Sequence, residues 1–386
     1  MIVTQAYELV NLATQETLGA EAVLNEDLSN IVDIGSQIFN ANSVDKFAKS
    51  LVDHIGKVVF VDRPYSGSAP SVLMDGWEYG AVCEKVFQRR LPEAEENESW
   101  ELEDRVSYDP NIFYKPDVGA KFFDKRVTFE IPQSITEMQI KSAFSSAQQI
   151  TSFTSMLLTG VDNSMTVKTD DLVMRTINNM TAETIYDYLS TGAQITDVGN
   201  TRCVNLLKLY NDTYNQSLTA DECIYNAGFI RFASYQMGVV KSRLAKISQL
   251  FNMGSADRFT PADRLHFVTL ADFTASADVF LQSDTFHNEF VRLPKSETVP
   301  YWQGSGIAYD FDSISSINVK TASGHTVTAS GILGVMFDRD ALGVSNLDRK
   351  TTSSYNPKSE FYNTWFKFTS GYFNDFNENF VVFYVA

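Results

Sequence analysis

Apolar and polar residues divide the chain into an irregular start, a helical middle and a β-rich final third. The first 45 residues contain seven acidic residues and no basic residue, and their apolar residues follow no sustained period. This pattern predicts an N-terminal arm that becomes ordered against its surroundings.

Three stretches in the first third are predicted to be β-strands. Leu51–Asp62 ends in a β-rich run before an Arg-Pro loop, and Ala81–Arg90 and Arg126–Ile131 are also strand-like. In Arg126–Ile131 apolar and polar residues alternate, as on a half-buried strand. We expect Ala81–Arg90 and Arg126–Ile131 to form two arms of one long hairpin. Leu91–Lys125 lies between them and exceeds the ~12–15 residues at which loops become unusual, which indicates a role outside the core of its own chain.

Helical spacing dominates the middle of the chain. Capping boxes at Ser134–Glu137 and Thr219–Glu222 mark two predicted helix starts, because their side chains satisfy backbone amides that have no partner within the helix. Helices are predicted over Ser134–Leu157, ending before Gly160, over Thr169–Leu189, and from Cys223 to about Phe251.

From Leu265 the pattern changes to strand-like runs. Strands are predicted at Leu265–Leu270, Ile314–Val319, Thr326–Phe337, Tyr362–Phe368 and Phe380–Val385, and a short helix at Ala275–Leu281. No internal repeat and no linker rich in Gly, Ser or Pro separates independent domains. The fold class is therefore α+β, with two or three lobes sharing a core.

Composition narrows the possible functions. The chain has 386 residues, 44% of them hydrophobic, and a formal net charge of −17, which disfavours gripping nucleic acid through its phosphates. No positively charged segment precedes an apolar stretch, and the apolar runs are too short to cross a bilayer, so we expect a soluble protein with no secretory signal and no membrane partner. Cys83, Cys203 and Cys223 are few and widely spaced, which favours reduced thiols.

Motifs of catalysis and ligand binding are missing from the sequence. It has no GxxxxGK[ST] or GxGxxG phosphate loop and no GxSxG elbow, and its four histidines lie far apart. We therefore expect no catalytic residue, no metal and no cofactor. One enzyme alternative stays open, a carbohydrate-active enzyme using Asp310 and Asp312 beside Trp302. The alternation of Tyr309 and Phe311 with these aspartates instead favours an ordinary half-buried strand, and the segment Phe337–Asp340 favours a strand that ends in a charged turn.

Aromatic and charged residues near the long loop are candidates for contacts between chains. Aromatic residues make up 13% of the chain, and aromatic residues and arginine are favoured in the centres of interfaces. The alternative for the aromatic residues is local packing within the chain. The acidic cluster Glu93–Asp104 either is a solvated face or binds basic residues of another copy. The candidate contact residues are Trp77, Arg89, Arg90, Glu93, Glu95, Glu96, Trp100, Phe113 and Tyr114.

Four short segments, in this order along the chain, carry a resemblance to a known family. They are Ser50–Val59 (SLVDHIGKVV), Glu84–Pro92 (EKVFQRRLP), Lys141–Phe144 (KSAF) and the terminal strand Phe380–Tyr384 (FVVFY). Together they resemble the major capsid protein of tailed bacteriophages, which has the Hong Kong 97-type fold, and within it the small short-tailed phages, the podoviruses. Each segment alone is weak evidence, so the order and the spacing carry the resemblance.

The resemblance implies a division of the chain. It comprises an N-terminal arm at 1–48, the start of a peripheral domain at 49–62, an extended loop at 63–131, the peripheral domain with a long spine helix at 132–192, an axial domain at 193–345, and C-terminal strands of the peripheral domain at 346–386. The implied function is structural and not enzymatic. Copies would self-assemble into an icosahedral-type shell that encloses the double-stranded DNA of the phage.

The partners that the resemblance implies are other copies of the chain, arranged as hexamers and pentamers, and a portal protein. Whether a scaffolding protein is also needed stays open. The packaged DNA would be enclosed without sequence-specific binding, with an acidic inner wall along which the duplex slides. Assembly is expected in the host cytoplasm, the mature location in the virion capsid, and covalent cross-links between subunits are not expected. An encapsulin-like nanocompartment shell is the alternative with the same fold.

Overall fold

The computed structural model describes residues 3–19, 24–25, 29–40, 46–47, 50, 69–72, 83–94, 96, 104–105, 111–139, 147–282, 296–303, 310–321 and 324–386. Its helices are α1 (Val3–Leu18), α2 (Ile31–Asn40), α5 (Ala147–Ser190), α6 (Leu206–Tyr214), α7 (Ala220–Cys223), α8 (Ala227–Leu244), α9 (Ala271–Gln282) and α10 (Phe311–Ile314). Its strands are β1 (Cys83–Gln88), β2 (Val118–Phe123), β3 (Arg126–Thr136), β4 (Cys203–Asn205), β5 (Leu265–Leu270), β6 (Glu297–Val299), β7 (Ile317–Lys320), β8 (Thr326–Ala329), β9 (Ile332–Asp338), β10 (Leu342–Asn356), β11 (Phe361–Asn374) and β12 (Phe380–Tyr384).

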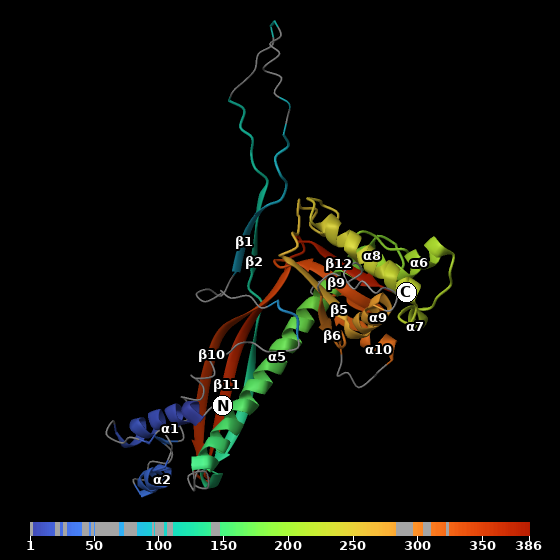
Figure 1. The fold of residues 1–386 in the computed structure, drawn as a ribbon. Helices are drawn as coiled ribbons and strands as arrows, with labels where there is room; N and C mark the ends of the chain where they lie inside the picture. The colour runs from blue at the N-terminus through green and yellow to red at the C-terminus, as the bar shows by residue number, and fades with distance from the viewer. Residues whose placement is uncertain are drawn as a thin grey trace.

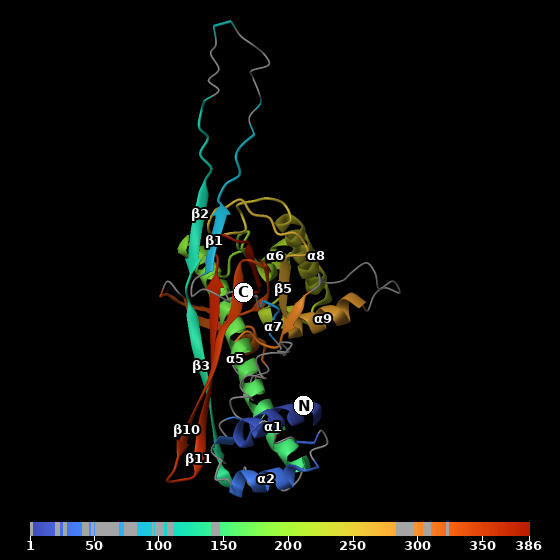
Figure 2. The same ribbon diagram turned by 90° about the vertical axis from the view of Figure 1, so that its left-hand side faces the viewer.

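These elements form an elongated molecule with three parts (Figures 1 and 2). A lobe is built on the five-stranded sheet β4-β12-β9-β5-β6, and a long three-stranded sheet β10-β11-β3 extends away from it beside α5. The hairpin of β1 and β2 projects in the opposite direction from the three-stranded sheet.

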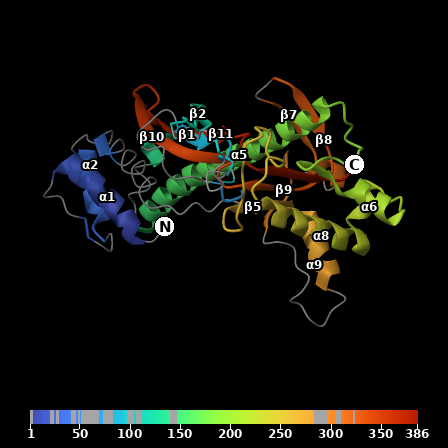
Figure 3. The same ribbon diagram turned by 90° about the horizontal axis from the view of Figure 1, so that it is seen from above.

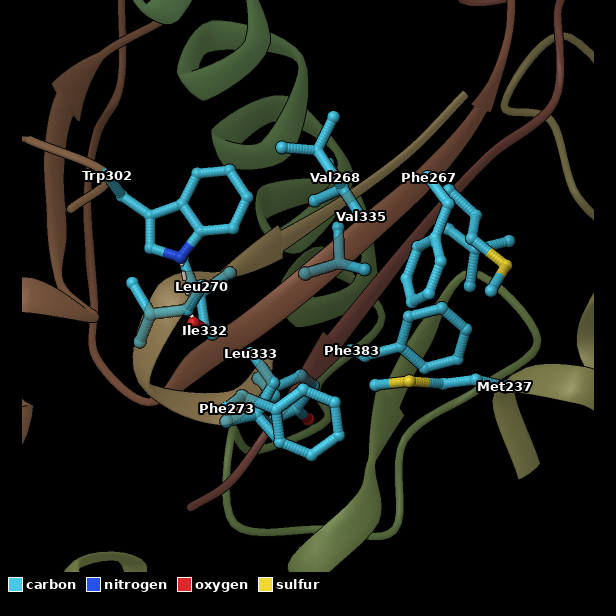
Figure 4. Packing of buried hydrophobic residues seen from close by; sticks show 14 of the residues in the cluster. Met237, Phe267, Val268, Leu270, Phe273, Trp302, Ile332, Leu333, Val335 and Phe383 are labelled. Atoms are coloured by element: carbon cyan, nitrogen blue, oxygen red, sulfur yellow. Dashed lines mark hydrogen bonds between the residues drawn. The ribbon is translucent and has the colours of Figure 1, made fainter. Parts of the chain in front are cut away.

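The lobe holds the main hydrophobic core. Figure 3 shows α5 on one side of the five-stranded sheet and α8 and α9 on the other. Because both faces are covered, β9 and β12 are buried along their whole length, and their sequences are almost uninterrupted apolar runs. Figure 4 shows Phe267, Phe383 and Met237 packed together, and the two phenylalanine rings meet edge to face at 6.5 Å.

The three-stranded sheet is antiparallel, with β11 in its centre. The predicted alternation of Arg126–Ile131 is confirmed, because every second side chain of β3 is partly buried. Phe129 lies opposite Phe368 in the register, with ring centroids 5.1 Å apart. The predicted pairing of Ala81–Arg90 with Arg126–Ile131 is wrong. Asp124 and Lys125 are not part of a strand and separate β2 from β3. Strand β2 therefore pairs with β1, while β3 joins the three-stranded sheet.

Helix α5 spans 44 residues and is about 66 Å long at 1.5 Å per residue. The sequence predicted one helix that ends before Gly160 and another that begins at Thr169. Both boundaries are wrong, since α5 continues through them. Gly160 has no unusual backbone angle, and a glycine inside a helix costs only about 1 kcal/mol. The hydroxyl of Thr169 donates to the Met165 carbonyl, four residues earlier, so the threonine is satisfied inside the helix.

The predicted capping box at Ser134 is also wrong. Ser134 lies in β3 and its hydroxyl donates to Asn363 Oδ1 at 2.6 Å. The reciprocal cap forms two residues later, where the Gln139 amide donates to the Thr136 hydroxyl and the Thr136 amide donates to Gln139 Oε1. The capping box at Thr219 is confirmed. The helix predicted from Cys223 to Phe251 is divided into α7 and α8, because Asn226 caps a new helix that ends at Leu244.

The N-terminal segment contains two helices where the sequence predicted no regular period. In α1 the buried face includes Val10, Ala13, Thr14 and Thr17, and it packs against α5 and α2. The hydroxyls of Thr14 and Thr17 donate to carbonyls four residues earlier, so these polar residues can occupy buried positions.

The β-rich final third is mostly as predicted. Leu265–Leu270 is confirmed as β5, the short helix is α9, and the last strand is β12. Ile314 belongs to α10 instead of the predicted strand, which begins at Ile317. The predicted strand Thr326–Phe337 is two strands, because Gly331 turns the chain with φ +75°. Strand β10 and helix α6 were not predicted, and Leu51–Asp62 lies outside the described residues.

Candidate interaction surface on an anchored hairpin

The hairpin of β1 and β2 has two different faces. Six residue pairs join its strands, and successive side chains point to opposite faces. The inner face, toward the body of the protein, carries Lys85 and Phe87 of β1 and Lys121 of β2. The outer face carries Val86, Val118 and Phe122, which we call the outer apolar face.

The outer apolar face is exposed. Val86, Val118 and Phe122 keep 64%, 56% and 63% of their surface accessible. A two-stranded ribbon is marginally stable by itself, and a contiguous row of exposed apolar side chains usually marks a protein interface. The outer apolar face therefore has the chemistry of a surface that another protein chain covers.

The inner face is anchored by charge. Lys85 Nζ lies 2.8 Å from Asp375 Oδ2 and 2.8 Å from Glu378 Oε1. Lys121 Nζ lies 2.9 Å from Asp375 Oδ1, the other oxygen of the same carboxylate. Arg258 Nε completes the cluster at 3.1 Å from Glu378 Oε1. We call these five residues the anchor cluster.

Burial makes the charges of the anchor cluster depend on one another. Burial opposes ionisation of Asp375, but the charges and hydrogen bonds of Lys85 and Lys121 outweigh it and hold the pKa of the carboxyl below its usual value. Burial likewise opposes a charge on Lys85, while Asp375 and Glu378 outweigh it and raise the lysine pKa. Asp375 and Lys85 therefore each favour the charged form of the other.

A second attachment fixes the end of β1 to the lobe. The Leu91 amide donates to Asp257 Oδ2 at 2.9 Å, and the Asp257 amide donates to the Arg89 carbonyl at 2.9 Å. The Leu91 hydrogen bond, with help from Gln249, lowers the pKa of Asp257. Arg258 donates to the Gln88 carbonyl at 3.0 Å, so β1 is attached to the body at Lys85 and again at its last residue.

The predicted contact residues that the structure describes all lie on the hairpin. Arg89, Arg90, Glu93 and Glu96 are exposed on the segment that follows β1. Phe113 and Tyr114 are exposed on the segment that precedes β2. Trp77, Glu95 and Trp100 lie outside the described residues.

Sequence reasoning missed both the outer apolar face and the anchor cluster. The outer apolar face had a signal, because Val86 breaks the polar series Glu84, Gln88 on its side of the strand. The sequence gives only a partial signal for the anchor cluster, because Asp375 is 290 positions from Lys85 and no local pattern links the two.

The alternative catalytic arrangement is not formed. Trp302 is buried and its indole nitrogen donates to the Ile332 carbonyl at 2.8 Å, so it offers no platform for a sugar. Asp310 caps α10, and hydrogen bonds from Ser313 lower its pKa, whereas a general acid needs a raised one. The predicted strand alternation around Asp312 is wrong, because Asp312 lies in the first turn of α10.

The charged turn predicted at Phe337–Asp340 is confirmed. Strand β9 ends at Asp338, and Arg264 pairs with both Asp338 and Asp340. Among the described residues, no group of three or more His, Cys, Asp or Glu side chains is placed to hold a metal ion. Within the same residues, no helix is long and apolar enough to cross a membrane. The cysteines are free thiols, and burial raises the pKa of Cys203 and Cys223 to about 12.

Comparison of the sequence with models of known protein families identifies the family of this chain. The model of the Phi29-like phage major capsid protein family matches residues 10–384. The chain belongs to the Phi29-like phage major capsid protein family. The predicted identity as a tailed-phage major capsid protein is thereby confirmed, and its role is structural, the formation of the virion capsid shell. The encapsulin-like alternative is not favoured.

Comparison with solved structures finds phage capsid chains that are similar to this Phi29-like capsid protein. The capsid structure of Staphylococcus phage Andhra matches with a TM-score of 0.50 and 9% identity, over 84% of this chain and 86% of that chain. The capsid of Cyanophage P-SCSP1u matches with a TM-score of 0.45 and 10% identity, over 84% and 90%. A Mycobacterium phage Che8 chain matches with a TM-score of 0.38 and 10% identity, over 84% and 94%. No curated protein sequence matches the chain. The likeness to the Andhra capsid confirms the predicted Hong Kong 97-type capsid fold.

Proposed function

We propose that each copy seats its outer apolar face on a neighbouring copy, and that this contact drives assembly of the shell. The observation that supports the proposal is the combination of Val86, Val118 and Phe122 exposed on one side of the hairpin with the anchor cluster on the other. A rigid ribbon binds with less loss of conformational entropy than a mobile one, so anchoring favours the contact.

The candidate contact residues extend this surface. We propose that Phe113 and Tyr114 act as aromatic anchors on the neighbour, and that Arg89, Arg90, Glu93 and Glu96 form a charged rim. Trp77, Glu95 and Trp100 remain candidates on sequence grounds alone. Exposure of the six described residues supports the proposal.

The shell that we propose is icosahedral, consists of hexamers and pentamers, and encloses the double-stranded genome of the phage. A portal protein, and a scaffolding protein if one is needed, would complete it during assembly in the host cytoplasm. The net charge of −17 supports enclosure of DNA without sequence-specific binding.

The division of the chain is likewise a proposal, with the hairpin inside the extended loop 63–131 and α5 as the spine helix of 132–192. Residues 1–48 would form the arm, 49–62 and 346–386 the remainder of the peripheral domain, and 193–345 the axial domain. The long helix α5 and the separate five-stranded sheet support it.

The test replaces two residues of the outer apolar face by threonine, in the double variant Val86→Thr with Phe122→Thr. Threonine is polar but keeps a high β-propensity. Purified wild-type protein, alone and with virion extract, is expected to form closed shells in electron micrographs and sedimentation profiles. The variant is expected to remain unassembled at the same concentration. The matched control, Val167→Thr with Val198→Thr, removes exposed apolar groups elsewhere and should assemble. Normal assembly of the hairpin variant would contradict the proposal.

A further inference from the structure

A groove runs along the exposed side of α8 and the segment that follows it. It has a volume of about 910 Å³, and its lining includes Tyr235, Ile247 and Leu250, which are exposed large hydrophobic residues. Helix α8 packs its opposite side into the lobe through residues such as Phe229 and Met237. The groove therefore presents apolar surface that the chain's own described core does not cover.

The rim of this groove is basic, although the chain as a whole is strongly acidic. Arg243 and Lys246 line the groove and are exposed. Within the described part of the chain, neither has a carboxylate oxygen within 4.0 Å. Arg243 lies in the last turn of α8, where a positive charge complements the helix dipole. Lys246 lies beyond the helix, so the dipole alone does not account for the pair.

Two helices that carry exposed acidic residues and no basic residue lie lower in the same lobe. Figures 1 and 2 place α9 below α8, and Figure 1 shows α10 at the lower edge of the lobe. Asp278 of α9 and Asp312 of α10 are exposed, and Val279 beside Asp278 keeps 62% of its surface accessible. Neither helix contains lysine or arginine. We call Asp278, Val279 and Asp312 the acidic edge.

We propose that the α8 groove of one copy receives the acidic edge of a second copy. Tyr235, Ile247 and Leu250 would cover Val279, while Arg243 and Lys246 would pair with Asp278 and Asp312. Because the two surfaces differ, the contact is heterologous, and its repetition around an axis closes a ring. The inference deepens the proposed function and rests on it, adding a contact that is separate from the hairpin.

A nucleic acid is the competing occupant, because basic side chains beside a tyrosine also suit phosphates and bases. The acidic edge and the net charge of −17 on the same chain favour a second copy, since they would repel a polyanion. Charge complementarity between copies guides association and fixes register, which a ring requires.

The experiment reverses charge on each surface and then on both. In Arg243→Glu with Lys246→Glu, and separately in Asp278→Lys with Asp312→Lys, like charges face each other at every contact. Each double variant should raise the concentration needed for assembly at least about tenfold. The fourfold variant restores opposite charges at every contact and should assemble within about threefold of the wild-type concentration. Asp310 is left unchanged because it caps α10.

The control variant, Lys350→Glu with Lys358→Glu, makes the same change in net charge as the Arg243 and Lys246 variant, on other exposed residues, and should assemble as wild type. Circular dichroism checks that every variant is folded. Wild-type assembly at unchanged concentration in the double variants, or no recovery in the fourfold variant, would overturn the inference. So would weaker binding of a fluorescent DNA duplex by the Arg243 and Lys246 variant with assembly unaffected.

A second measurement uses the wild-type chain and is independent of folding in the variants. A zero-length carbodiimide cross-link between Lys246 and Asp278 or Asp312, identified by mass spectrometry, should form in assembled or concentrated protein and be missing from dilute monomer. Absence of this cross-link in assembled shells would count against the groove contact. A wild type that forms no shells even with virion extract would contradict the proposed function, while the cross-link in concentrated protein still decides the groove.

Discussion

Asp375 is the residue on which the attachment of the hairpin depends most. Its side chain is fully buried, and its two oxygens bind Lys85 and Lys121, one from each strand of the hairpin. Substitution by Asn keeps the volume and one acceptor oxygen but removes the charge. Both lysines then lose their shared counterion, while Lys85 keeps Glu378.

The size of the effect follows from the burial of the three groups. Removing one partner of a fully buried ion pair costs about 3–5 kcal/mol. The lysine side chains are 22% and 33% exposed, so water reduces the loss toward the lower end, about 3 kcal/mol. If the hairpin detaches before the lobe unfolds, this free energy corresponds to about a hundredfold increase in the equilibrium constant for its opening.

Hydrogen exchange of backbone amides measures that opening directly. In Asp375→Asn the amides that join β1 to β2 should exchange about a hundredfold faster, while those of β9 and β12 keep their wild-type rates. Lys168→Met is the matched control, because it breaks an exposed pair with Asp171 and should change neither set measurably. Equal acceleration in the hairpin and the lobe, or none in the hairpin, would refute the view that Asp375 holds the hairpin locally.

Two further predictions concern the pH dependence of the interaction between Asp375 and Lys85 and the substitution of two glycines by alanine. Because the pKa of Asp375 is lowered and that of Lys85 is raised, the stability that these two groups contribute is present between their ordinary pKa values of 3.8 and 10.5, and it is lost as pH falls below the first or rises above the second. The difference in urea unfolding free energy between wild type and Asp375→Asn should therefore shrink below pH 3.8. A constant difference down to pH 2 would contradict this expectation. Gly331→Ala should lower the unfolding free energy by at least about 2 kcal/mol, because φ is +75° and an added Cβ would lie 2.0 Å from the Val385 carbonyl oxygen, whereas Gly160→Ala in α5, with open space around it, should raise it by about 0.5–1 kcal/mol.

Local patterns predicted the strands that are buried on both sides or alternate cleanly. Phe380–Val385 and Leu265–Leu270 could be found because apolar runs bounded by turn residues have few other solutions. Strand β10 could not, since the stretch from Lys350 to Ser354 is charged and rich in hydroxyls, and it is ordered by pairing with β11.

Threonine explains why the helices were found less accurately. In α1 and α5, buried positions are occupied by threonines whose hydroxyls bond to the carbonyl four residues earlier, such as Thr14, Thr176 and Thr184. A periodicity counted on apolar residues treats these positions as polar and loses the helical face. The apolar pattern therefore shows no period at 3–18 and a new start at Thr169, although the described side chains include a buried set from Val10 to Thr17 in α1 and from Val161 to Tyr188 in α5.

The anchor cluster shows where sequence reasoning reaches its limit. Once β1 and β2 are paired, Lys85 lies directly opposite Lys121 on the inner face, and like charges at such a pair are destabilising unless a counterion lies between them. Pairing therefore demands a carboxylate from elsewhere, but only the tertiary structure identifies it as Asp375. A ribbon that repels itself until it docks on the body gains its order there, and this leaves the outer apolar face as the side available to a neighbouring copy.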